Sequence, residues 1–396
     1  MVLIMPNMKR REFLILAATL PAALQSAAFA ATRRPTDYLD ELVKDGIAPG
    51  AALVASCRGS VKMKKAVGTC CQIGNRAAQL SLDTAHPLYS FSKLITGTMV
   101  ALSVTEGRLA YGDLVSKHIP EFAGGGKDTI TIRHCLTHSA GLAKVESKPV
   151  PDAAGWQQAL QNLCAATAEW PPGSQSAYHG WSGAFLAAEC VRRVNGGTPW
   201  AELCRAQLFA PLGTKSLSYA LPANNANVAL VPPPGADKPL PETAQVAFGY
   251  AGQPGAGCFG TLGDALTVLH FHLQAGVWRS QRLIAPEVFR EMHTVQYARE
   301  IAAARAAGRS PAHEPWGLGP LLRGDGPACE AHQWFGFAHQ TSPGIFGHAG
   351  INTLIGVGDL QSGIALVFAT TDSPKSSAET VTVRNQATDL VFGALS

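Results

Sequence analysis

The sequence predicts a mixed α/β fold of the α+β kind, in which an antiparallel sheet is flanked by helices and carries an inserted, mostly helical domain. Three observations lead to this prediction. Patterns typical of β-hairpins occur near both ends of the chain, and the segment between them shows helical periodicity broken at Pro and Gly. The 396 residues are 46% hydrophobic and 15% charged, which suffices for a sizeable core and excludes a disordered class.

The first thirty residues differ from the rest of the chain. A basic stretch at 9–11 precedes an apolar run at 13–24 and a small-x-small end at 28–30, the pattern of a cleavable secretory signal. Two adjacent arginines just before Phe13 are typical of the twin-arginine route. Roughly 12 apolar residues are too few to span a membrane. We therefore expect a signal peptide at 1–30 and a periplasmic or secreted protein with no stable membrane anchor after cleavage.

The sheet is predicted from two hairpins. "PGAALVASCRG" and "SVKMKKAVGT" meet at a turn-like Arg58-Gly59, and "NTLIGVGD" and "GIALVFATT" flank "LQS" near the other end. A helix in "DYLDELVKDG" precedes the first hairpin, and a last helix follows the second from about 378 to 395. We expect the two hairpins to share one sheet.

The insertion is predicted from helical segments separated by loops. These are "FSKLITGTMVALSVTEG", "AAGWQQALQNLCAAT", "GAFLAAECVRRVNG" and, after the insertion, "FGTLGDALTVLHFHLQAG". The Pro- and Asn-rich stretch at 221–242 is interpreted as a long surface loop. These patterns predict one domain at 31–396. It has a sheet subdomain from about 35–85 and 250–396 and a helical subdomain at about 86–249.

Charge and cysteine content exclude several classes of partner. The net charge of +4 is spread along the chain without a Lys/Arg block, so a nucleic-acid partner is not expected. Nine cysteines without CxxC spacing fit neither a disulfide framework nor a zinc site.

One short motif carries candidate chemistry. In "YSFSKLITG", Ser90 and Lys93 are spaced i,i+3 and therefore share a helical face. At a helix start, the hydroxyl and N–H of Ser90 would face the positive end of the helix dipole, where an oxyanion is stabilised. Lys93 could then act on the serine proton. Alone, the motif is weak, because composition predicts roughly one such match by chance.

The segments around this motif make it specific. In order they are "EGRLAYGDLVSKHIPEF", "ITIRHCLTHSAGL", "WPPGSQSAYHGWSGAFLAAECV", "PGAGCFGTLGDALTVLHFHLQAG" and "FGHAGINTLIGVGDLQSGIALVFAT". From about Asp37 to its end the chain resembles the serine β-lactamase-related family, which includes class C β-lactamases, DD-peptidases and family VIII carboxylesterases. The resemblance implies a β-lactamase/transpeptidase-like fold and catalysis through an acyl-enzyme, without metal or organic cofactor.

The resemblance also implies roles for single residues. Ser90 matches the acylated nucleophile and Lys93 the lysine one turn later, and Tyr178 matches the tyrosine of the Tyr-x-Asn element, which handles protons. The backbone N–H of Ile351 would pair with that of Ser90 as an oxyanion hole. His348-Ala349-Gly350 lies where the family has Lys-Thr-Gly, at the substrate-binding strand. His179, beside the tyrosine, is expected at the wall of the site.

Two departures from the family pattern narrow the function. Gly180 replaces the Asn of Tyr-x-Asn, and His348-Ala349 replaces the Lys-Thr pair that receives a substrate carboxylate. We therefore predict an exported serine hydrolase, esterase-like, acting on a neutral carboxylic ester, lactone or small amide. The alternatives are a DD-peptidase or β-lactamase-like amidase, an acyltransferase, and a non-catalytic binding protein that keeps the fold. The expected partner is a small acyl substrate, and the oligomeric state is left open.

Other residues offer competing interpretations. Ser182 in "HGWSGA" nearly matches the nucleophile elbow of α/β-hydrolases but follows a loop and lacks the second Gly, so a helix-start role is favoured. His270 and His272 diverge at i,i+2 and are expected to pack rather than bind metal. The pair in "RHCLTHSAGL" is interpreted as structural, and Trp316 and Trp334 as acyl-pocket walls or core.

Overall fold

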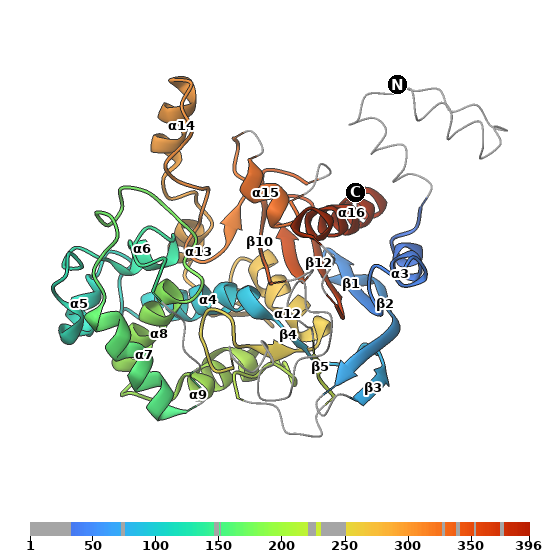
Figure 1. Ribbon diagram of the computed structural model, residues 1–396, viewed down its shortest axis with the longest axis horizontal. Coiled ribbons are helices and arrows are strands. Elements are labelled where there is room, and N and C mark those ends of the chain that lie inside the picture. Colours follow the sequence, from blue (N-terminus) through green and yellow to red (C-terminus); the bar gives the residue numbers. More distant parts are fainter. Residues whose placement is uncertain are drawn as a thin grey trace.

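The computed structural model describes residues 33–72, 76–145, 150, 152–220, 227–230, 251–326, 329–337, 341–351, 354–372 and 376–396. The predicted signal peptide and most of the 221–242 loop lie outside the described residues. Figure 1 shows a sheet on one side of the molecule, with most of the helices of the middle of the chain on the other side. This is the arrangement that the hairpin and helix patterns predict.

The two predicted hairpins share one sheet. β1 (Gly50–Cys57) pairs antiparallel with β2 (Ser60–Gln72) and also with β12 (Ile364–Thr370), which pairs in turn with β11 (Ile355–Asp359). Arg58 and Gly59 both have positive φ, at 48° and 77°, as a tight hairpin turn requires. The sheet prediction is therefore confirmed.

Three further strands extend this sheet, and short strands pair around it. The order is β3-β2-β1-β12-β11-β10-β9, with β3 (Arg76–Gln79), β10 (Ile345–Ala349) and β9 (Leu321–Leu322), while β5 (Ala229–Leu230) pairs with β2. Separate two-stranded pairs are formed by β4 (His86–Pro87) with β6 (Phe259–Gly260), and by β7 (Val277–Trp278) with β8 (Gln281–Arg282). β10 and β9 form the edge of the sheet nearest the helices.

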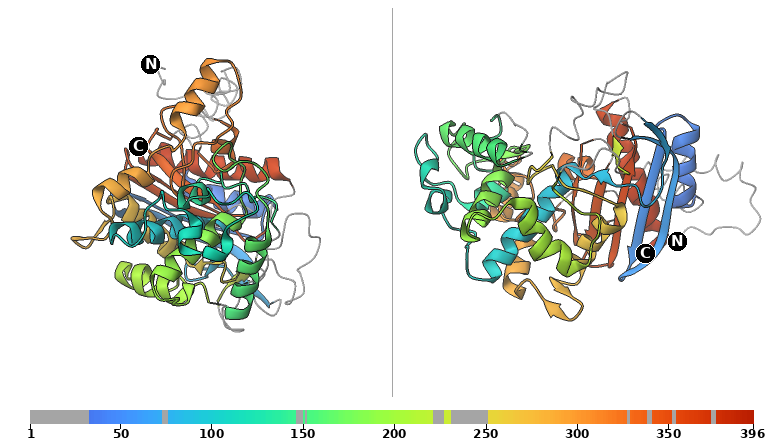
Figure 2. Two further views of the ribbon diagram at one scale, coloured as in Figure 1. Left: turned by 90° about the vertical axis from the view of Figure 1, so that its left-hand side faces the viewer. Right: turned by 90° about the horizontal axis from the view of Figure 1, so that it is seen from below.

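Helices cover both faces of the sheet (Figure 2). The outer face carries α3 (Pro35–Lys44) and α16 (Ser377–Leu395), and the inner face carries α12 (Leu262–Leu273) and α4 (Ser92–Thr105). β1 alternates accordingly, because Leu53 packs in the outer cluster whereas Val54 packs in the inner one. Burial on both faces explains why the strand sequences are nearly continuous apolar runs.

The remaining helices build the second half of the molecule. They are η1 (Tyr89–Phe91), α5 (Val115–His118), η2 (Pro120–Phe122), α6 (Ile132–Leu136), α7 (Ala153–Ala165), α8 (Ser182–Val194), α9 (Trp200–Cys204), η3 (Arg205–Phe209) and α10 (Ala210–Leu212). The helices predicted from 91–107, 153–167, 183–196 and 259–276 are confirmed as α4, α7, α8 and α12. α4 is buried almost all round and packs against α8, so it forms the centre of the molecule.

Three short helices at the sheet edge were not predicted from the sequence. They are α13 (Pro286–Met292), α14 (Ala298–Ala306) and α15 (Glu330–Trp334). In α14 only Ile301 is buried, so the segment lacks the apolar stripe that identifies a packed helix. Figure 1 shows α14 projecting from the body of the molecule.

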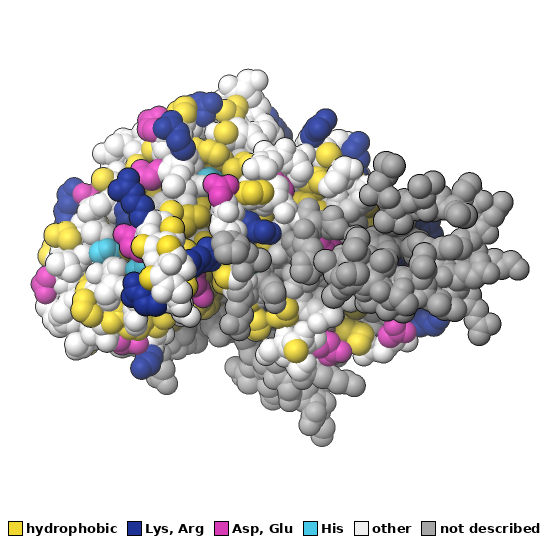
Figure 3. Space-filling view, turned by 90° about the horizontal axis from the view of Figure 1, so that it is seen from above, with side chains coloured by type: hydrophobic (Ala, Val, Ile, Leu, Met, Phe, Trp, Pro, Cys, Tyr) yellow, Lys and Arg dark blue, Asp and Glu magenta, His cyan; other side chains and the backbone are white. Residues whose placement is uncertain are grey.

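The surface shows no segregation of charge on the face drawn in Figure 3, where basic and acidic side chains are interspersed with apolar ones. Among the described residues, no helix is both long and apolar enough to cross a membrane.

Gly356 on β11 is expected to be indispensable for packing η1 on the sheet. A Cβ at this position would lie 2.2 Å from Cε2 and 2.5 Å from Cδ2 of Phe91, a residue of η1. We predict that Gly356→Ala lowers the free energy of unfolding by about 1–3 kcal/mol through overpacking. Denaturant unfolding of the variant measures this loss. Gly112→Ala is the matched control, because a Cβ there meets no atom within 4 Å; equal midpoints for the two variants would contradict the prediction.

Candidate active site

Ser90 lies in η1, the single 3-10 turn that leads directly into α4. Its side chain is at the surface of a cleft of 580 Å³ although the residue is only 8% exposed. The preceding Tyr89 has φ of 44°, a left-handed conformation that bulky residues rarely adopt. Such backbone conformations persist where the surrounding structure enforces them, and they cluster at functional sites.

Lys93 lies beneath Ser90, as the i,i+3 spacing predicts. Its Nζ is 3.3 Å from Ser90 Oγ and donates to two backbone carbonyls, those of Gly180 at 2.8 Å and Gly255 at 3.0 Å. The residue is 3% exposed. Burial lowers the pKa of Lys93 to about 7, so the charged and neutral amines are both populated near neutral pH. A neutral amine at this distance can accept the serine proton.

Tyr178 covers the lysine from the cleft side. The centroid of its ring lies 4.9 Å from Lys93 Nζ, and the residue is 39% exposed in the same cleft as Ser90. The ring also packs on that of His138, with 4.7 Å between centroids. The structure thus brings together the three residues to which the sequence assigns the chemistry.

His138 and His179 brace the loop that carries Tyr178. His138 Nδ1 accepts from the His179 N–H at 3.0 Å, and His179 Nε2 accepts from the Leu142 N–H at 2.9 Å. His179 Nδ1 therefore carries the ring proton and donates to the Ala177 carbonyl at 2.5 Å. His179 is fully buried, so it lies behind the wall of the cleft, with both ring nitrogens engaged by the backbone.

His348 is buried at the end of β10 among aromatic rings. Its Nδ1 lies 2.7 Å from the Ala349 carbonyl, so Nδ1 is the donor and Nε2 carries a lone pair. Nε2 has no hydrogen-bond partner among the described residues. Burial holds the pKa of His348 well below its usual value, so this position carries no positive charge. Its ring packs 4.8 Å from that of Phe335.

The two proposed oxyanion donors line one cleft. Ser90 and Ile351 both belong to its wall, and in the described part of the chain neither backbone N–H donates to a backbone carbonyl. Gly350 permits this approach, because a Cβ there would lie 3.1 Å from Tyr89 Cβ and 3.3 Å from the Leu88 carbonyl oxygen. The arrangement suits a pair of N–H donors aimed at one developing oxyanion.

Arg384 on α16 is a residue of the site that the sequence did not identify. It is fully buried and donates through Nη2 to the Gly350 carbonyl and through Nη1 to the Trp334 carbonyl, the latter at 2.9 Å. Burial lowers the pKa of Arg384 to about 9, which still leaves the guanidinium charged at pH 7. The only sequence signal was an arginine on the helix face that carries Thr380, Ala387 and Val391.

The lining of the cleft is mainly apolar. Its described residues are Ser90, Tyr178, Glu314, Ala331, Trp334, Phe335, Ala349, Gly350, Ile351, Ser377 and Thr380. No basic side chain is among them, and the single charged group is Glu314. Trp334 lines the cleft, whereas Trp316 is fully buried and donates to Glu314 Oε2 at 2.9 Å.

The competing candidates are engaged elsewhere. Ser182 begins α8, as expected, and donates to the Leu142 carbonyl at 2.7 Å. His270 bonds Ser56 through Nε2 at 2.6 Å, and His272 bonds Thr98 through Nε2 at 2.9 Å. Within the described ranges no group of three or more His, Cys, Asp or Glu residues is arranged to hold a metal ion.

The chain is similar in sequence to known proteins. The beta-lactamase family model matches residues 36–389. The esterase/beta-lactamase LipL of Mycobacterium tuberculosis (strain ATCC 25618 / H37Rv) is 30% identical over 149 residues, which are 37% of this chain and 34% of LipL. The match thus spans about a third of that curated relative's length.

Solved structures show the same fold. A penicillin-binding protein homolog from Caulobacter crescentus superposes with a TM-score of 0.68 at 23% identity, covering 93% of this chain and 97% of that chain. EstCE1, described as a hydrolase with promiscuous acyltransferase activity, gives a TM-score of 0.70 at 20% identity, and the superposition covers 93% of this chain and 99% of EstCE1. The predicted β-lactamase/transpeptidase-like fold is confirmed.

The lowered pKa of Lys93 generates a pH prediction. If the neutral amine accepts the proton of Ser90, the rate of Ser90 modification by a fluorophosphonate rises with pH through about 7 and levels off above it. Intact-mass spectrometry at timed intervals between pH 5 and 9 measures this rate. Lys93→Arg keeps the positive charge but cannot give up its proton, so its rate of Ser90 modification is expected to be about 10²–10⁴-fold lower.

Lys117→Arg on α5 is the matched control for this measurement, because Lys117 is exposed and remote from the cleft. A rate that is independent of pH, or an unchanged rate in Lys93→Arg, would refute the assignment of Lys93 as the proton acceptor.

Proposed function

The chain belongs to the beta-lactamase family of serine hydrolases, and on that premise we propose that it is an exported, esterase-like hydrolase that forms an acyl-enzyme on Ser90. The proposed substrate is a neutral carboxylic ester, lactone or small amide. One observation carries the proposal: Ser90, with Lys93 Nζ 3.3 Å from its Oγ, opens into a cleft without a basic side chain among its described residues. The export part of the proposal rests on the sequence of residues 1–30.

Acylation begins with proton transfer from Ser90 Oγ to the neutral amine of Lys93. The serine oxygen attacks the acyl carbon, and the carbonyl oxygen becomes an oxyanion that accepts from the N–H groups of Ser90 and Ile351. When the tetrahedral intermediate collapses, the bond to the leaving alcohol or amine breaks. The leaving group takes the proton back, delivered from Lys93 through the phenol of Tyr178, which covers the amine.

Deacylation repeats these steps with water. Tyr178 and Lys93 accept a proton from the water while its oxygen attacks the acyl carbon, and the ester bond to Ser90 breaks. The serine oxygen regains its proton and the carboxylic acid leaves. Each proton that is removed in one half-reaction is returned in the same half-reaction, so no external acid or base is consumed.

Arg384 supports the oxyanion hole from behind. The Gly350 carbonyl to which it donates belongs to the same peptide unit as the Ile351 N–H. A cation at the carbonyl oxygen holds the plane of this peptide and strengthens the N–H at its other end, since hydrogen-bonded groups in series polarise one another. Arg384 is therefore a positioning residue, whereas Ile351 contacts the reacting oxygen.

The lining of the cleft favours substrates without a negative charge. His348, which is buried next to the lining rather than part of it, is neutral where the family has a lysine. Glu314, which does line the cleft, repels an anion. Trp334 and Phe335 offer apolar surface to an acyl or alcohol group. Gly180 contributes only its carbonyl, to Lys93, and a Cβ there would meet no atom within 4 Å, so space is left where the family places a substrate-binding amide.

Acyl transfer is a second candidate for the fate of the acyl-enzyme. The similar structure of EstCE1 is described as that of a hydrolase with promiscuous acyltransferase activity. An alcohol acceptor would take the place of water in deacylation and release a new ester. Product analysis in the presence of a short alcohol separates the two outcomes, because transfer yields an ester whereas hydrolysis yields only the acid.

The proposed function predicts a specific labelling pattern. The protein is exposed in parallel to a fluorophosphonate, p-nitrophenyl butyrate and a penicillin, and intact mass and ester turnover are measured. We expect a single phosphonate adduct, ester turnover and no stable penicilloyl adduct. Ser90→Ala is expected to abolish adduct and turnover. Ser182→Ala, which removes the competing serine, is expected to keep both.

Two outcomes would change the proposal. A stable penicilloyl adduct on Ser90 would replace the esterase assignment by a DD-peptidase. The absence of any adduct would overturn catalysis on Ser90 and leave a binding protein on this fold.

Arg384 generates a further prediction. Lysine keeps a charge but cannot donate to two carbonyls in the planar fork of arginine. We predict that Arg384→Lys lowers kcat for p-nitrophenyl butyrate about 10–100-fold with little change in KM, because the oxyanion is bound only after attack. Steady-state kinetics tests this, with thermal unfolding to establish that the variant is folded. A folded variant with unchanged kcat, or with only KM raised, would contradict the positioning role.

A further inference from the structure

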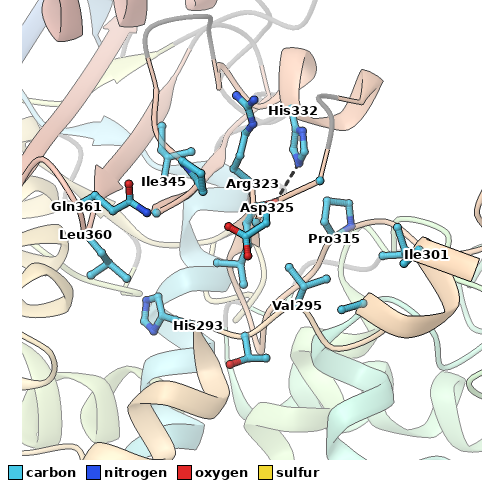
Figure 4. Close-up of a pocket in the computed structure, with 18 of the residues that line it drawn as sticks. His293, Val295, Ile301, Pro315, Arg323, Asp325, His332, Ile345, Leu360 and Gln361 are labelled. Atoms are coloured by element: carbon cyan, nitrogen blue, oxygen red, sulfur yellow. Dashed lines mark hydrogen bonds between the residues drawn. The ribbon is translucent and has the colours of Figure 1, made fainter. Parts of the chain in front are cut away.

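A second cavity lies at the edge of the sheet, apart from Ser90. It has a volume of 610 Å³ and is formed by α14, the segment that follows α13, the turn after β9, the start of β10 and the turn between β11 and β12. Figure 4 shows its side chains converging from these elements. None of the residues that line it also lines the cleft of Ser90. Its volume is in the range of cavities that hold small organic ligands.

The cavity contains two arginines that have no acidic partner among the described residues. Arg305 and Arg323 line it, and neither makes an ion pair or side-chain hydrogen bond with a described residue. Nε of Arg323 is excluded from solvent with no acceptor among the described residues. Asp325 also lines the cavity but is exposed and pairs with neither arginine. A buried guanidinium N–H without an acceptor is costly, and a ligand oxygen would remove that cost.

The charge of the cavity at neutral pH is positive. Burial lowers the pKa of His293 and of His332 to about 4, so both imidazoles are neutral at pH 7. The charges of Arg305 and Arg323 contribute further to the lowering at His332. The charged side chains in the lining are therefore two guanidinium groups and one carboxylate, which gives a net positive charge. Figure 4 shows Arg323 and His332 side by side at one end, with Asp325 nearer the middle.

The rest of the wall is apolar. Val295, Ile301, Pro315, Leu322, Ile345 and Leu360 all line the cavity. Inorganic anions such as phosphate would leave this surface in contact with water, whereas an organic anion would cover it and gain hydrophobic free energy. Both guanidinium groups act electrostatically on His332, and much of the remaining wall is aliphatic. This combination matches an amphiphilic anion.

We propose that this cavity is a binding site for a small organic anion, a carboxylate or sulfonate with an apolar body, held by Arg305 and Arg323. The anionic group bonds the two guanidinium groups, and the apolar body lies against Val295, Ile301 and Leu360. The site is independent of the chemistry at Ser90 and does not rest on the proposed function.

Isothermal titration of the whole protein with naphthalene-2-carboxylate tests the site, with naphthalene-2-carboxamide as the neutral counterpart. We expect saturable binding of one carboxylate per chain and at least about tenfold weaker binding of the amide, the magnitude of one charge-assisted hydrogen bond. Arg305→Met and Arg323→Met are each expected to weaken carboxylate binding by a similar factor. Arg299→Met is the matched control, since Arg299 is an exposed arginine of α14 that does not line the cavity.

A second variant keeps the test decisive if an arginine variant unfolds. Ala302 lines the cavity and is exposed, so Ala302→Phe fills space without opening a buried site, and it is expected to weaken binding of both acid and amide. Three results would overturn the proposal. They are no saturable binding of the carboxylate, equal affinity for acid and amide, and arginine variants that bind as Arg299→Met does.

Discussion

The site depends on the burial of the Lys93 amine, which costs free energy because the charged group loses its contact with water. An ammonium group removed from water must be solvated by the protein, and here the carbonyls of Gly180 and Gly255 do so. These carbonyls belong to chain segments far apart in the sequence, so the lysine holds together the start of α4, the loop after Tyr178 and the loop before β6. The carbonyl dipoles do not fully replace water, and the pKa falls to about 7. The Lys93 amine therefore both links these segments and can release or accept a proton near neutral pH.

A second buried cation extends the same principle. Arg384, like Lys93, donates hydrogen bonds to backbone carbonyls. Both cations lie next to the cleft, since Lys93 Nζ is 3.3 Å from Ser90 Oγ and Arg384 donates to the Gly350 carbonyl. A reaction that creates an oxyanion there would benefit from their field. The imidazoles of His138 and His348 stay neutral, since burial holds the pKa of each well below its usual value. Among the described residues next to Ser90 and Gly350, the positive charge is thus carried by Lys93 and Arg384.

The parts of this arrangement that the sequence predicts are those with a periodic or local signature. The hairpins and the helices α4, α7, α8 and α12 repeat a pattern over many residues, and the spacing of Ser90 and Lys93 places them on one helical turn. Tyr178 and Ile351 required the family resemblance, because their distance from Ser90 along the chain carries no local signal. The carbonyls that hold Lys93 could not be predicted, since backbone groups look alike in every residue. Helix α14 was missed because it lacks an apolar stripe, and α13 and α15 because seven and five residues are too short for a periodic pattern to stand out. The cavity beside α14 and α15 was missed with them.

The two cavities lie on either side of α15 and β10, and both elements contribute residues to the lining of each cavity. Helix α15 presents Ala331 and Trp334 to the cleft and His332 to the second cavity. Strand β10 begins with Ile345 at the second cavity and ends at the cleft, a length of roughly 17 Å. Their charges are opposite, because the described lining of the cleft bears one carboxylate and no basic group. In the proposed reaction a neutral ester becomes a carboxylate, which the negative wall of the cleft binds less well than the substrate. Weaker binding of the product than of the substrate would favour turnover, and the same electrostatic contrast would direct organic anions to the cavity behind α15 rather than to Ser90.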